Sequence, residues 1–292
     1  MSADLEQAEV RRPVVPGAAP PRRRRRPRAF GLGSLLRTAL PPLLLLAAVI
    51  GAWYFVTYVL LDPDRRFLLP PPQDVITIGF QDQANLTEVL NGLWATTQVA
   101  LAGLVISIVI GVTLAVFMSQ AKWIERSFYP YAVVLQTVPV LALVPLIGFW
   151  FGFDFQSRVI VVVIFSLFPI ITNTLFGLQS VTQDLRDLFA LNRAGRASTL
   201  WRLQLPASLP AMFTGIRISA GLSVIGAIVG DFFFRQGEPG IGRLLDIYSQ
   251  RLETEQLIAA IFFSSLLGLV VFWGVGYIGH RVVGAWYDPA ER

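Results

Sequence analysis

The chain has 292 residues, of which 54% are hydrophobic and 15% charged, with a formal net charge of +5 and a mean hydropathy of +0.60. Soluble domains carry about 25% charged residues, so this composition excludes an ordinary soluble protein and predicts a membrane protein. The absence of cysteine excludes disulfides and thiolate metal sites. We expect the single histidine, His280, to lie at a membrane interface.

The first 37 residues are rich in proline and arginine and have too few large apolar residues to build a core. The run PRRRRRPR at residues 21–28 has two interpretations. It is either a nucleic-acid patch or part of a disordered cytoplasmic tail beside the first membrane span. Nothing nearby predicts a nucleic-acid-binding module, so we favour the tail and expect no nucleic-acid partner.

A membrane helix needs about 20 mainly apolar residues. Six segments meet this requirement and are the expected spans: 38–61, 89–118, 128–152, 159–178, 211–234 and 257–283. The first could be a signal peptide, but its apolar run is long and no clean small-residue cleavage site follows it. Pro41 and Pro42 are expected in its first turn. Pro139 and Pro145 predict a kink or local unwinding in the third span.

Six spans place both termini on one side of the membrane. Because cytoplasmic loops are enriched in lysine and arginine, the basic residues indicate a cytoplasmic N-terminus. The expected organisation is a disordered cytoplasmic tail (1–37), a first span (38–61), an extracytoplasmic connection (62–88), a five-span core (89–283) and a cytoplasmic tail (284–292).

The polar loop 181–210 separates two strongly hydrophobic segments, and this orientation makes it cytoplasmic. Residues 182–202 have helix-forming character with apolar side chains at Leu185, Leu188 and Phe189. This pattern predicts a short amphipathic helix that docks to a soluble partner. Leu205-Pro206 is expected to end one element, with Pro210 ahead of the fifth span.

The sequence lacks the usual marks of an enzyme. It has no phosphate-binding loop, no nucleophile–histidine–acid set and no cluster of metal ligands, so we expect no catalysis and no cofactor. The run Gly237-Glu238-Pro239-Gly240-Ile241-Gly242 contains a Gly-x-Gly pattern that is too weak for a nucleotide fingerprint and predicts a tight turn.

Polar residues within the apolar spans are the candidates for lining a pathway, although such residues also mediate helix packing. The candidates are Gln98, Gln136, Thr172, Asn173 and Thr174. Arg217 either extends to the cytoplasmic surface or pairs with the loop 181–210. Asp231, at the outer end of the fifth span, either faces an extracytoplasmic partner, lines the pathway mouth or lies at the water boundary.

Several motifs carry a resemblance to a known family. The polar loop ends in Leu205-Pro206-Ala207-Ser208-Leu209-Pro210, and Gly215-Ile216-Arg217 follows it. The other stretches are LPPPQDV at 69–75, FWFG at 149–152 and GIG at 240–242. With these motifs the chain resembles the membrane subunits of binding-protein-dependent ABC importers of the nitrate/sulfonate/taurine type, over roughly residues 68–286.

The loop of this family begins with Glu-Ala-Ala followed by a glycine. Counting back without a gap from Leu205-Pro206 puts Asp187-Leu188-Phe189 where the family has Glu-Ala-Ala. The same count puts Arg193 at the position of the family's glycine, and Gly195 follows two residues later. The resemblance implies an ATPase-coupling role for Asp187, Leu188, Phe189, Arg193, Gly195, Arg196, Leu205 and Pro206. We expect replacement of Asp187 or Gly195 to lower transport and ATPase association.

The resemblance implies an all-α permease of type I architecture, forming a homodimer in the plasma membrane. Its expected partners are a cytoplasmic ATP-binding subunit and an extracytoplasmic solute-binding protein. The expected substrate is a small solute, either like sulfonate, taurine or nitrate, or like a pyrimidine or flavin. The largely uncharged interior favours a neutral or aromatic solute. A self-sufficient carrier or channel and a structural membrane anchor stay as alternatives.

Overall fold

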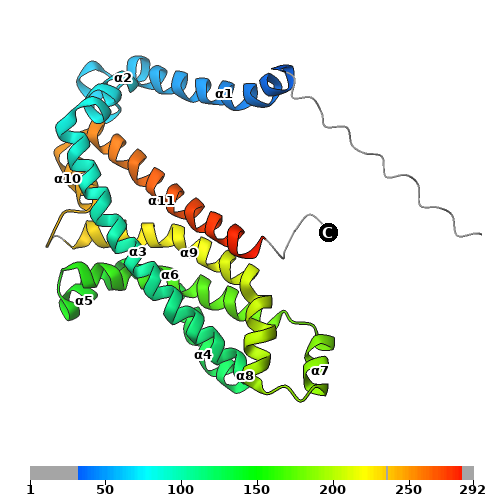
Figure 1. The fold of residues 1–292 in the computed structure, drawn as a ribbon. Coiled ribbons are helices and arrows are strands. Elements are labelled where there is room, and N and C mark those ends of the chain that lie inside the picture. The colour runs from blue at the N-terminus through cyan, green and yellow to red at the C-terminus, as the bar shows by residue number, and fades with distance from the viewer. Residues whose placement is uncertain (1–31, 235, 285–292) are drawn as a thin grey trace, which may run out of the picture. The chain divides into compact units, whose positions relative to one another are not determined.

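The structure is a computed structural model that describes residues 32–234 and 236–284 (Figure 1). The regular elements of these residues are all helices, which confirms the all-α fold class. The chain divides into two units, Met1–Gly51 and Ala52–Arg292, and helix α1 (Leu32–Phe55) crosses the boundary. The expected terminal tails fall mostly outside the described residues.

Five helical segments of the described residues are long and apolar enough to cross a membrane. They are Leu40–Leu60, which joins α1 to the π-helical turn η1 (Val56–Leu60), then α3 (Gln83–Gln120), α6 (Phe155–Gln179), the run Arg196–Phe233 and α11 (Thr254–Val283). A sixth is the pair α4 (Lys122–Thr137) and α5 (Val140–Phe151), bent by 99° where they meet. The expected break near Pro139 is therefore a sharp bend between two separate helices.

Close approaches at glycines give the direction of each core helix. Gly103 of α3 lies against Val162 of α6, and Gly111 lies against Ile170, so α3 and α6 run in the same direction. Two consecutive parallel helices need a connection that crosses back between them. The α4–α5 pair provides this connection and is the sixth candidate crossing among the described residues.

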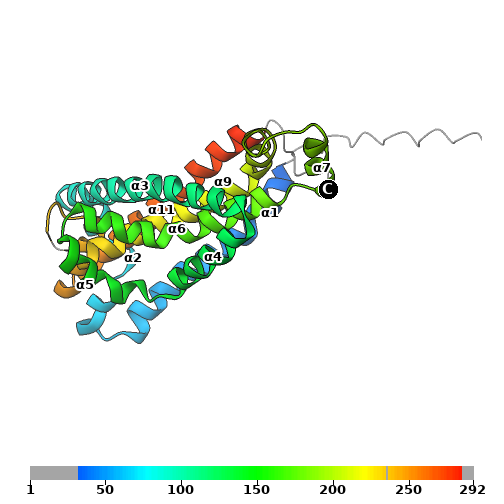
Figure 2. The ribbon, with the colours of Figure 1, turned by 90° about the horizontal axis from the view of Figure 1, so that it is seen from below.

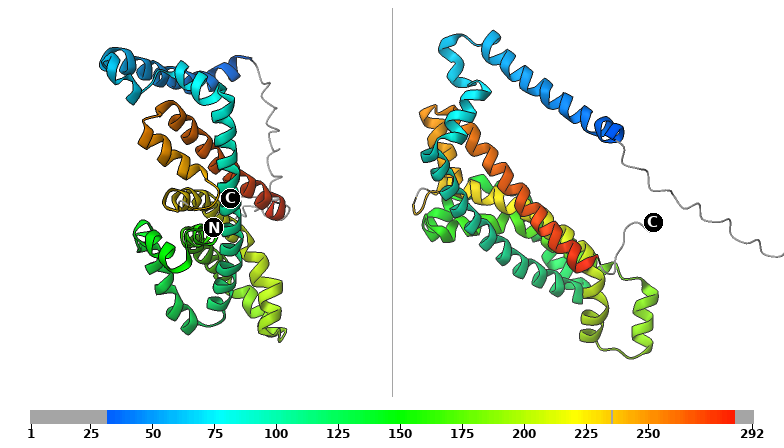
Figure 3. Two further views of the ribbon diagram at one scale, coloured as in Figure 1. Left: turned by 90° about the vertical axis from the view of Figure 1, so that its left-hand side faces the viewer. Right: turned by 45° about the horizontal axis from the view of Figure 1, so that its top comes forward.

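The remaining core helices alternate in direction. Helix α9 (Leu205–Phe233) is antiparallel to α6, and α11 is antiparallel to α9, with Gly276 against Arg217 and Gly279 against Phe213. The short helices α7 (Gln183–Leu191) and α10 (Ile241–Arg251) consequently lie at opposite ends of this core, as Figures 1, 2 and 3 all show. We call these the α7 end and the α10 end.

The centre of the core is a seam of small residues between α6 and α9. A Cβ atom on Gly215 would lie 2.6 Å from the carbonyl oxygen of Pro169, and one on Gly226 would lie 3.0 Å from the Cα of Val162. Ser219 is also buried in this seam. In a membrane there is no hydrophobic driving force for one helix to pack against another, so close packing must stabilise their contact. Small residues allow this by letting the helix backbones approach closely. The seam therefore fixes α6 and α9 against each other.

One expectation about the first third of the chain needs correction. Helix α1 begins at Leu32, so Pro41 and Pro42 lie inside it and not in its first turn. The connection 62–88 is mostly helical, formed by η2 (Pro63–Leu68), α2 (Pro72–Asp74), η3 (Val75–Gln81) and the start of α3. It is held to the end of the first span by the Trp53 indole, which donates to the Pro70 carbonyl at 2.9 Å.

Candidate functional site

The loop 181–210 is built around helix α7, which stands apart from the helix bundle (Figure 1). Leu185, Leu188 and Leu191 follow each other at three-residue spacing, which puts them along one side of the helix. All three are exposed, and Leu191 reaches 82%. An isolated nine-residue helix with an uncovered apolar stripe is typical of a surface that packs against a partner.

A Schellman motif fixes the C-terminal end of α7. The amide of Ala194 donates to the Phe189 carbonyl at 3.0 Å and that of Arg193 to the Ala190 carbonyl at 2.9 Å. This motif needs a left-handed residue at its centre, and Arg193 takes that conformation with φ of 53°. Arg193 is the residue that the ungapped count sets at the family's glycine, and glycine is the residue best suited to this backbone.

Gly195, in contrast, has an ordinary backbone. Its φ is −68° and it precedes α8 (Arg196–Thr199) as the N-cap residue. A Cβ atom there would meet nothing within 4 Å. The steric reason for a glycine in this loop therefore lies at position 193.

The end of α6 and the start of α9, which flank the loop, pack closely against each other at its base. A Cβ atom on Gly177, near the end of α6, would lie 2.9 Å from the Cα, Cβ and carbonyl oxygen of Ser208 in α9. Beside this crossing, the Gln179 amide donates to the Glu125 carboxylate at 2.9 Å and Arg186 donates to the Gln179 carbonyl at 3.1 Å. The base is therefore rigid, and it joins α7 to the core.

The expectation that Leu205-Pro206 ends an element is wrong. Helix α8 continues through the π-helical turn η4 (Leu200–Gln204) into α9, so Pro206 and Pro210 lie within one helical run. Proline removes a backbone donor and its ring clashes with the carbonyl four residues back. The turn η4 widens the helix just before Pro206, with the Leu205 amide bonded to the Leu200 carbonyl five residues back, and relieves this clash.

The other loop residues divide between surface and interior. Asp187 and Leu188 are exposed, and the Gln183 amide donates to the Asp187 carboxylate at 2.8 Å. Phe189 is half-buried, while Leu205 packs into a cluster with Met118 and Leu178. Arg196 lines a polar pocket with Ser119, Gln120 and Gln204, between the end of α3 and the loop.

The pathway candidates do not converge on one site. Gln98 and Gln136 are exposed on α3 and α4. Asn173 donates to the Pro169 carbonyl at 2.8 Å within α6, and Thr172 donates to the Phe168 carbonyl at 3.0 Å. Thr174 is fully buried. The α6 residues thus satisfy or bury their polar groups within the chain.

Arg217 lies on the groove between α9 and α11. Its guanidinium sits 4.3 Å from the centre of the Phe272 ring, a cation–π contact. It lines a pocket of about 330 Å³ with Pro210 and His280 at the α7 end, and an apolar pocket of about 610 Å³ that includes Phe272 continues along the same groove. Among the described residues, no hydrogen bond or ion pair joins Arg217 to the loop 181–210. His280 is exposed.

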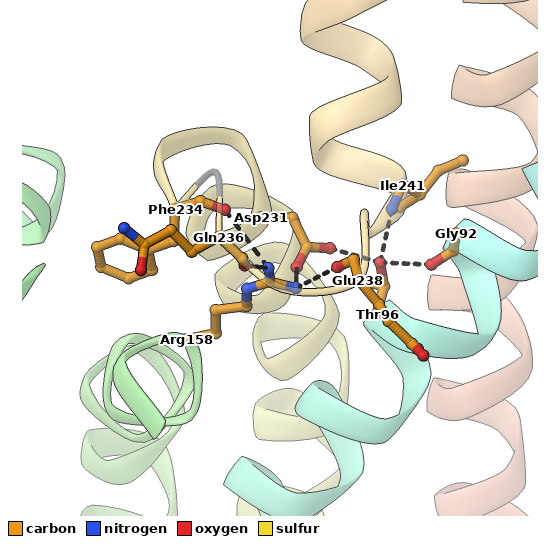
Figure 4. A network of polar contacts seen from close by, with 8 residues as sticks. All are labelled: Gly92, Thr96, Arg158, Asp231, Phe234, Gln236, Glu238 and Ile241. Carbon is orange, nitrogen blue, oxygen red and sulfur yellow. Dashed lines mark hydrogen bonds and ion pairs between the residues drawn. The ribbon is translucent and has the colours of Figure 1, made fainter. Parts of the chain in front are cut away.

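The α10 end contains a buried charge pair (Figure 4). Arg158 of α6 is 4% exposed and Asp231 of α9 is fully buried, and Arg158 Nη1 lies 3.2 Å from Asp231 Oδ1. Thr96 Oγ1 of α3 donates to Asp231 Oδ2 at 2.5 Å and accepts from the Ile241 amide at 2.8 Å. Asp231 therefore faces neither water nor an open pathway mouth.

Arg158 also holds the loop between α9 and α10. It donates to the carbonyl oxygens of Phe234, Gln236 and Glu238 at 3.5, 2.5 and 3.0 Å (Figure 4). Sequence reasoning missed Arg158 because it stands at the edge of a span, inside a short polar turn. The available signal was a basic and an acidic residue at matching depths of two consecutive antiparallel spans.

Comparison with known proteins identifies the chain. The family model described as binding-protein-dependent transport system inner membrane component matches residues 99–284. The chain belongs to this family. It is therefore the membrane permease subunit of a binding-protein-dependent ABC importer, and the family implies association with an ATP-binding subunit and a solute-binding protein.

Several relatives of this permease are curated transport proteins. The formylaminopyrimidine transport permease protein ThiX of Halalkalibacterium halodurans is 35% identical over 80% of this chain and 91% of the relative. The nitrate import permease protein NrtB of Leptolyngbya laminosa is 29% identical over 90% and 96%. The taurine transport system permease protein TauC of Escherichia coli is 28% identical over 84% and 89%.

A solved structure supports the fold of the permease. The amino acid ABC transporter crystallised with histidines has 17% sequence identity and a TM-score of 0.54, covering 68% of this chain and 94% of that chain. At this level of identity the similarity shows the fold alone.

Proposed function

We propose that the loop 181–210 is the ATPase-coupling element of this permease and that the α7 end faces the cytoplasm. The observation that carries the proposal is the exposed apolar stripe of α7, held on a capped helix that projects beyond the bundle. A soluble subunit that covers Leu185, Leu188 and Leu191 would bury apolar surface worth about 25 cal/mol per Å². The basic residues of the loop and of the N-terminal segment support the same orientation.

The proposed coupling is mechanical. ATP-driven closure of the partner would displace α7, and the crossing of Gly177 and Ser208 would pass the displacement to α6 and α9. The Schellman motif at Arg193 and the helical run through Pro206 reduce internal flexibility in the loop. Asp187, Phe189, Gly195, Arg196 and Leu205 contribute to the docking surface or to its support.

The working unit that we propose is a homodimer in the plasma membrane with both termini cytoplasmic. Six spans are few for enclosing a pathway alone, and α9 and α11 leave an apolar groove uncovered in the single chain. Gln98, Gln136 and Thr172 are the proposed lining residues, since the first two are exposed. Asn173 contacts Gly215, and Thr174 is buried, which supports packing roles for both.

The proposed substrate is a small neutral nitrogen heteroaromatic, such as a pyrimidine. Two features support this class over a sulfonate or nitrate. The relative at 35% identity carries the name formylaminopyrimidine transport permease protein. The charge of Arg158 is also neutralised by Asp231 and therefore offers no site to an anion in the membrane. A thermal-shift screen of the cognate binding protein with pyrimidines, riboflavin, taurine, alkanesulfonates and nitrate tests the assignment.

Copurification with the ATP-binding subunit tests the coupling role. We expect Leu188→Asp to abolish copurification, because it puts a charge into the centre of the apolar stripe. Trp123→Asp, which changes another highly exposed apolar residue outside the loop, is the matched control. Copurification of the Leu188 variant at the normal level would remove the coupling role. Uptake by vesicles driven by an ion gradient alone would favour a self-sufficient carrier.

A further inference from the structure

We propose that residues 236–239, on the loop between α9 and α10, form a docking element for the solute-binding protein. Arg158, Asp231 and Thr96 are the positioning residues that hold this element. The inference rests on the proposed function, because that function puts the α10 end outside the cell. We call residues 236–239 the crest.

The crest has exposed side chains and a fixed backbone. Gln236, Gly237, Glu238 and Pro239 are all exposed. The guanidinium of Arg158 donates four hydrogen bonds to described residues. Three of the acceptors are the backbone carbonyl oxygens of residues 234, 236 and 238. A buried arginine therefore commits most of its donors to the main chain of a surface loop.

The chain leaving the crest is fixed as tightly as the chain entering it. The Ile241 amide donates to Thr96 Oγ1 at 2.8 Å. Any Cβ atom on Gly240 would collide with the Asp231 carboxylate, and one on Gly242 would lie 2.9 Å from the Asp231 Cβ. The two glycines are required because the backbone wraps directly around Asp231.

The crest residues themselves restrict the conformation further. Gly237 has a φ of 83°, which glycine adopts without strain. Proline fixes its own φ, and Pro239 stands between the crest and Gly240. The carboxylate of Glu238 makes no hydrogen bond or ion pair with another described residue, and only its carbonyl is used by Arg158. Among the described residues, the Glu238 carboxylate is therefore exposed and unpaired on a backbone that Arg158 and Thr96 hold in place.

Energetics favour a functional reason for this arrangement. Removing two charges from water is expensive, and apolar residues of similar volume often stabilise a core equally well. The described contacts of Arg158 and Asp231 instead specify the shape of one exposed loop. A loop that is already ordered loses less conformational entropy when a partner binds. A surface of this kind fits a folded protein that presents a basic or hydrogen-bond-donating group to Glu238.

The position of the crest selects the partner. It lies at the α10 end, opposite α7 (Figures 1 and 2). If α7 contacts the ATP-binding subunit, the crest faces the compartment from which the binding protein delivers its solute.

The test uses the complete transporter reconstituted in liposomes with the cognate loaded binding protein. We expect Glu238→Lys to raise the KM for the binding protein in ATPase stimulation about tenfold, equivalent to about 1.4 kcal/mol. The rate at saturating binding protein should stay within about twofold, since docking is weakened and the later steps are not. Arg251→Lys, at an exposed basic residue of the α10 end outside the crest, should leave both values unchanged.

Arg158→Lys separates the ion pair from the loop contacts. Lysine keeps the charge opposite Asp231, but one ammonium group cannot span the three carbonyl oxygens that the guanidinium reaches. We expect this variant to fold and to raise the KM for the binding protein in the same way as Glu238→Lys.

Cross-linking gives a second readout that is independent of folding energetics. The chain has no cysteine, so Glu238→Cys introduces a unique reactive site. A thiol-to-amine cross-linker should join this variant to the binding protein, and Asn192→Cys at the α7 end should not react with it.

The outcomes separate the two levels of the proposal. Wild-type KM for both the Glu238→Lys and Arg158→Lys variants, without cross-linking from position 238, overturns the docking role alone. Cross-linking from position 192 to the binding protein overturns the proposed orientation, and the docking role with it. If the binding protein does not stimulate the ATPase activity of the wild-type transporter, the proposed function and the docking role are both overturned.

Discussion

Ser166 of α6 and Ser219 of α9 donate their hydroxyl groups to each other's backbone carbonyl oxygens, at 3.4 and 2.6 Å. These reciprocal bonds lie at the centre of the small-residue seam, where the helix backbones approach closely. The seam provides the sharpest prediction about the stability of the permease.

Gly215→Val should lower the free energy of unfolding by about 1–3 kcal/mol, because the added Cβ meets the backbone of Pro169. Thermal unfolding in detergent measures the change. The control is Gly274→Val on α11, where a Cβ atom meets nothing within 4 Å and the same helix propensity change applies. Equal melting temperatures for the two variants would contradict the seam.

Arg193→Gly should stabilise the loop 181–210 by about 1 kcal/mol, since glycine removes the strain of a left-handed side-chain residue. Hydrogen exchange at the amides of residues 193 and 194 should slow about fivefold. Gly195→Ala should leave this exchange unchanged, because its φ of −68° and open surroundings accept a side chain. Loss of transport in the Gly195 variant with normal exchange would point to a contact made only with the partner.

Asp231→Leu should destabilise the permease by about 3–5 kcal/mol, because it leaves the Arg158 charge buried without a partner. Adding Arg158→Met should recover part of this loss, since no charge is then buried. Unfolding of both single variants and the double variant in detergent measures the coupling. A double variant whose loss equals the sum of the single losses would show that the pair does not interact.

Tyr248 gives a prediction about alkaline pH. Its hydroxyl lies 3.1 Å from Asn85 Oδ1 and 3.0 Å from Glu88 Oε2, and its single proton is shared between these two acceptors. Burial and the Glu88 carboxylate raise the pKa of Tyr248 well above the ordinary 10.0. The folded chain therefore holds this proton more tightly than the unfolded chain, and the stability it contributes is complete below pH 10 and falls as the pH rises above 10.

The measurement is thermal unfolding between about pH 8 and 11. Tyr248→Phe should be less stable at pH 8, because Asn85 loses a hydrogen bond, but its stability should fall less steeply above pH 10. Identical slopes for the two proteins would show that Tyr248 titrates normally.

Much of the architecture could be predicted because membrane helices follow from local hydropathy. Each expected span overlaps a helix, and the break at Pro139 follows from proline chemistry. The ends of the helices could not be predicted as well. The helix through Pro206 and Pro210 persists because the turn η4 accommodates proline, a cooperative adjustment that a rule about single residues does not include.

The site was harder to predict because its contacts join residues far apart in the sequence. Arg158 and Asp231 are separated by 73 positions, and Thr96 and Asp231 by 135. The ungapped motif count identified Arg193 as the glycine equivalent, and the backbone there has the conformation that glycine prefers. The steric reason for Gly240 and Gly242, in contrast, depends on Asp231, which only the folded chain brings beside them.

Helix α9 joins the two regions that we propose to meet separate proteins. Ser208, at the base of the coupling loop, and Asp231, beneath the crest, are about 35 Å apart at 1.5 Å per residue. The helix is continuous between them, and η4 lies outside this stretch. Pro210 is the one proline inside this stretch and lies near its loop end, so a tilt imposed at one end would reach the other through an otherwise regular helix. Binding of a partner on one side of the membrane would then change the position of α9 on the other side.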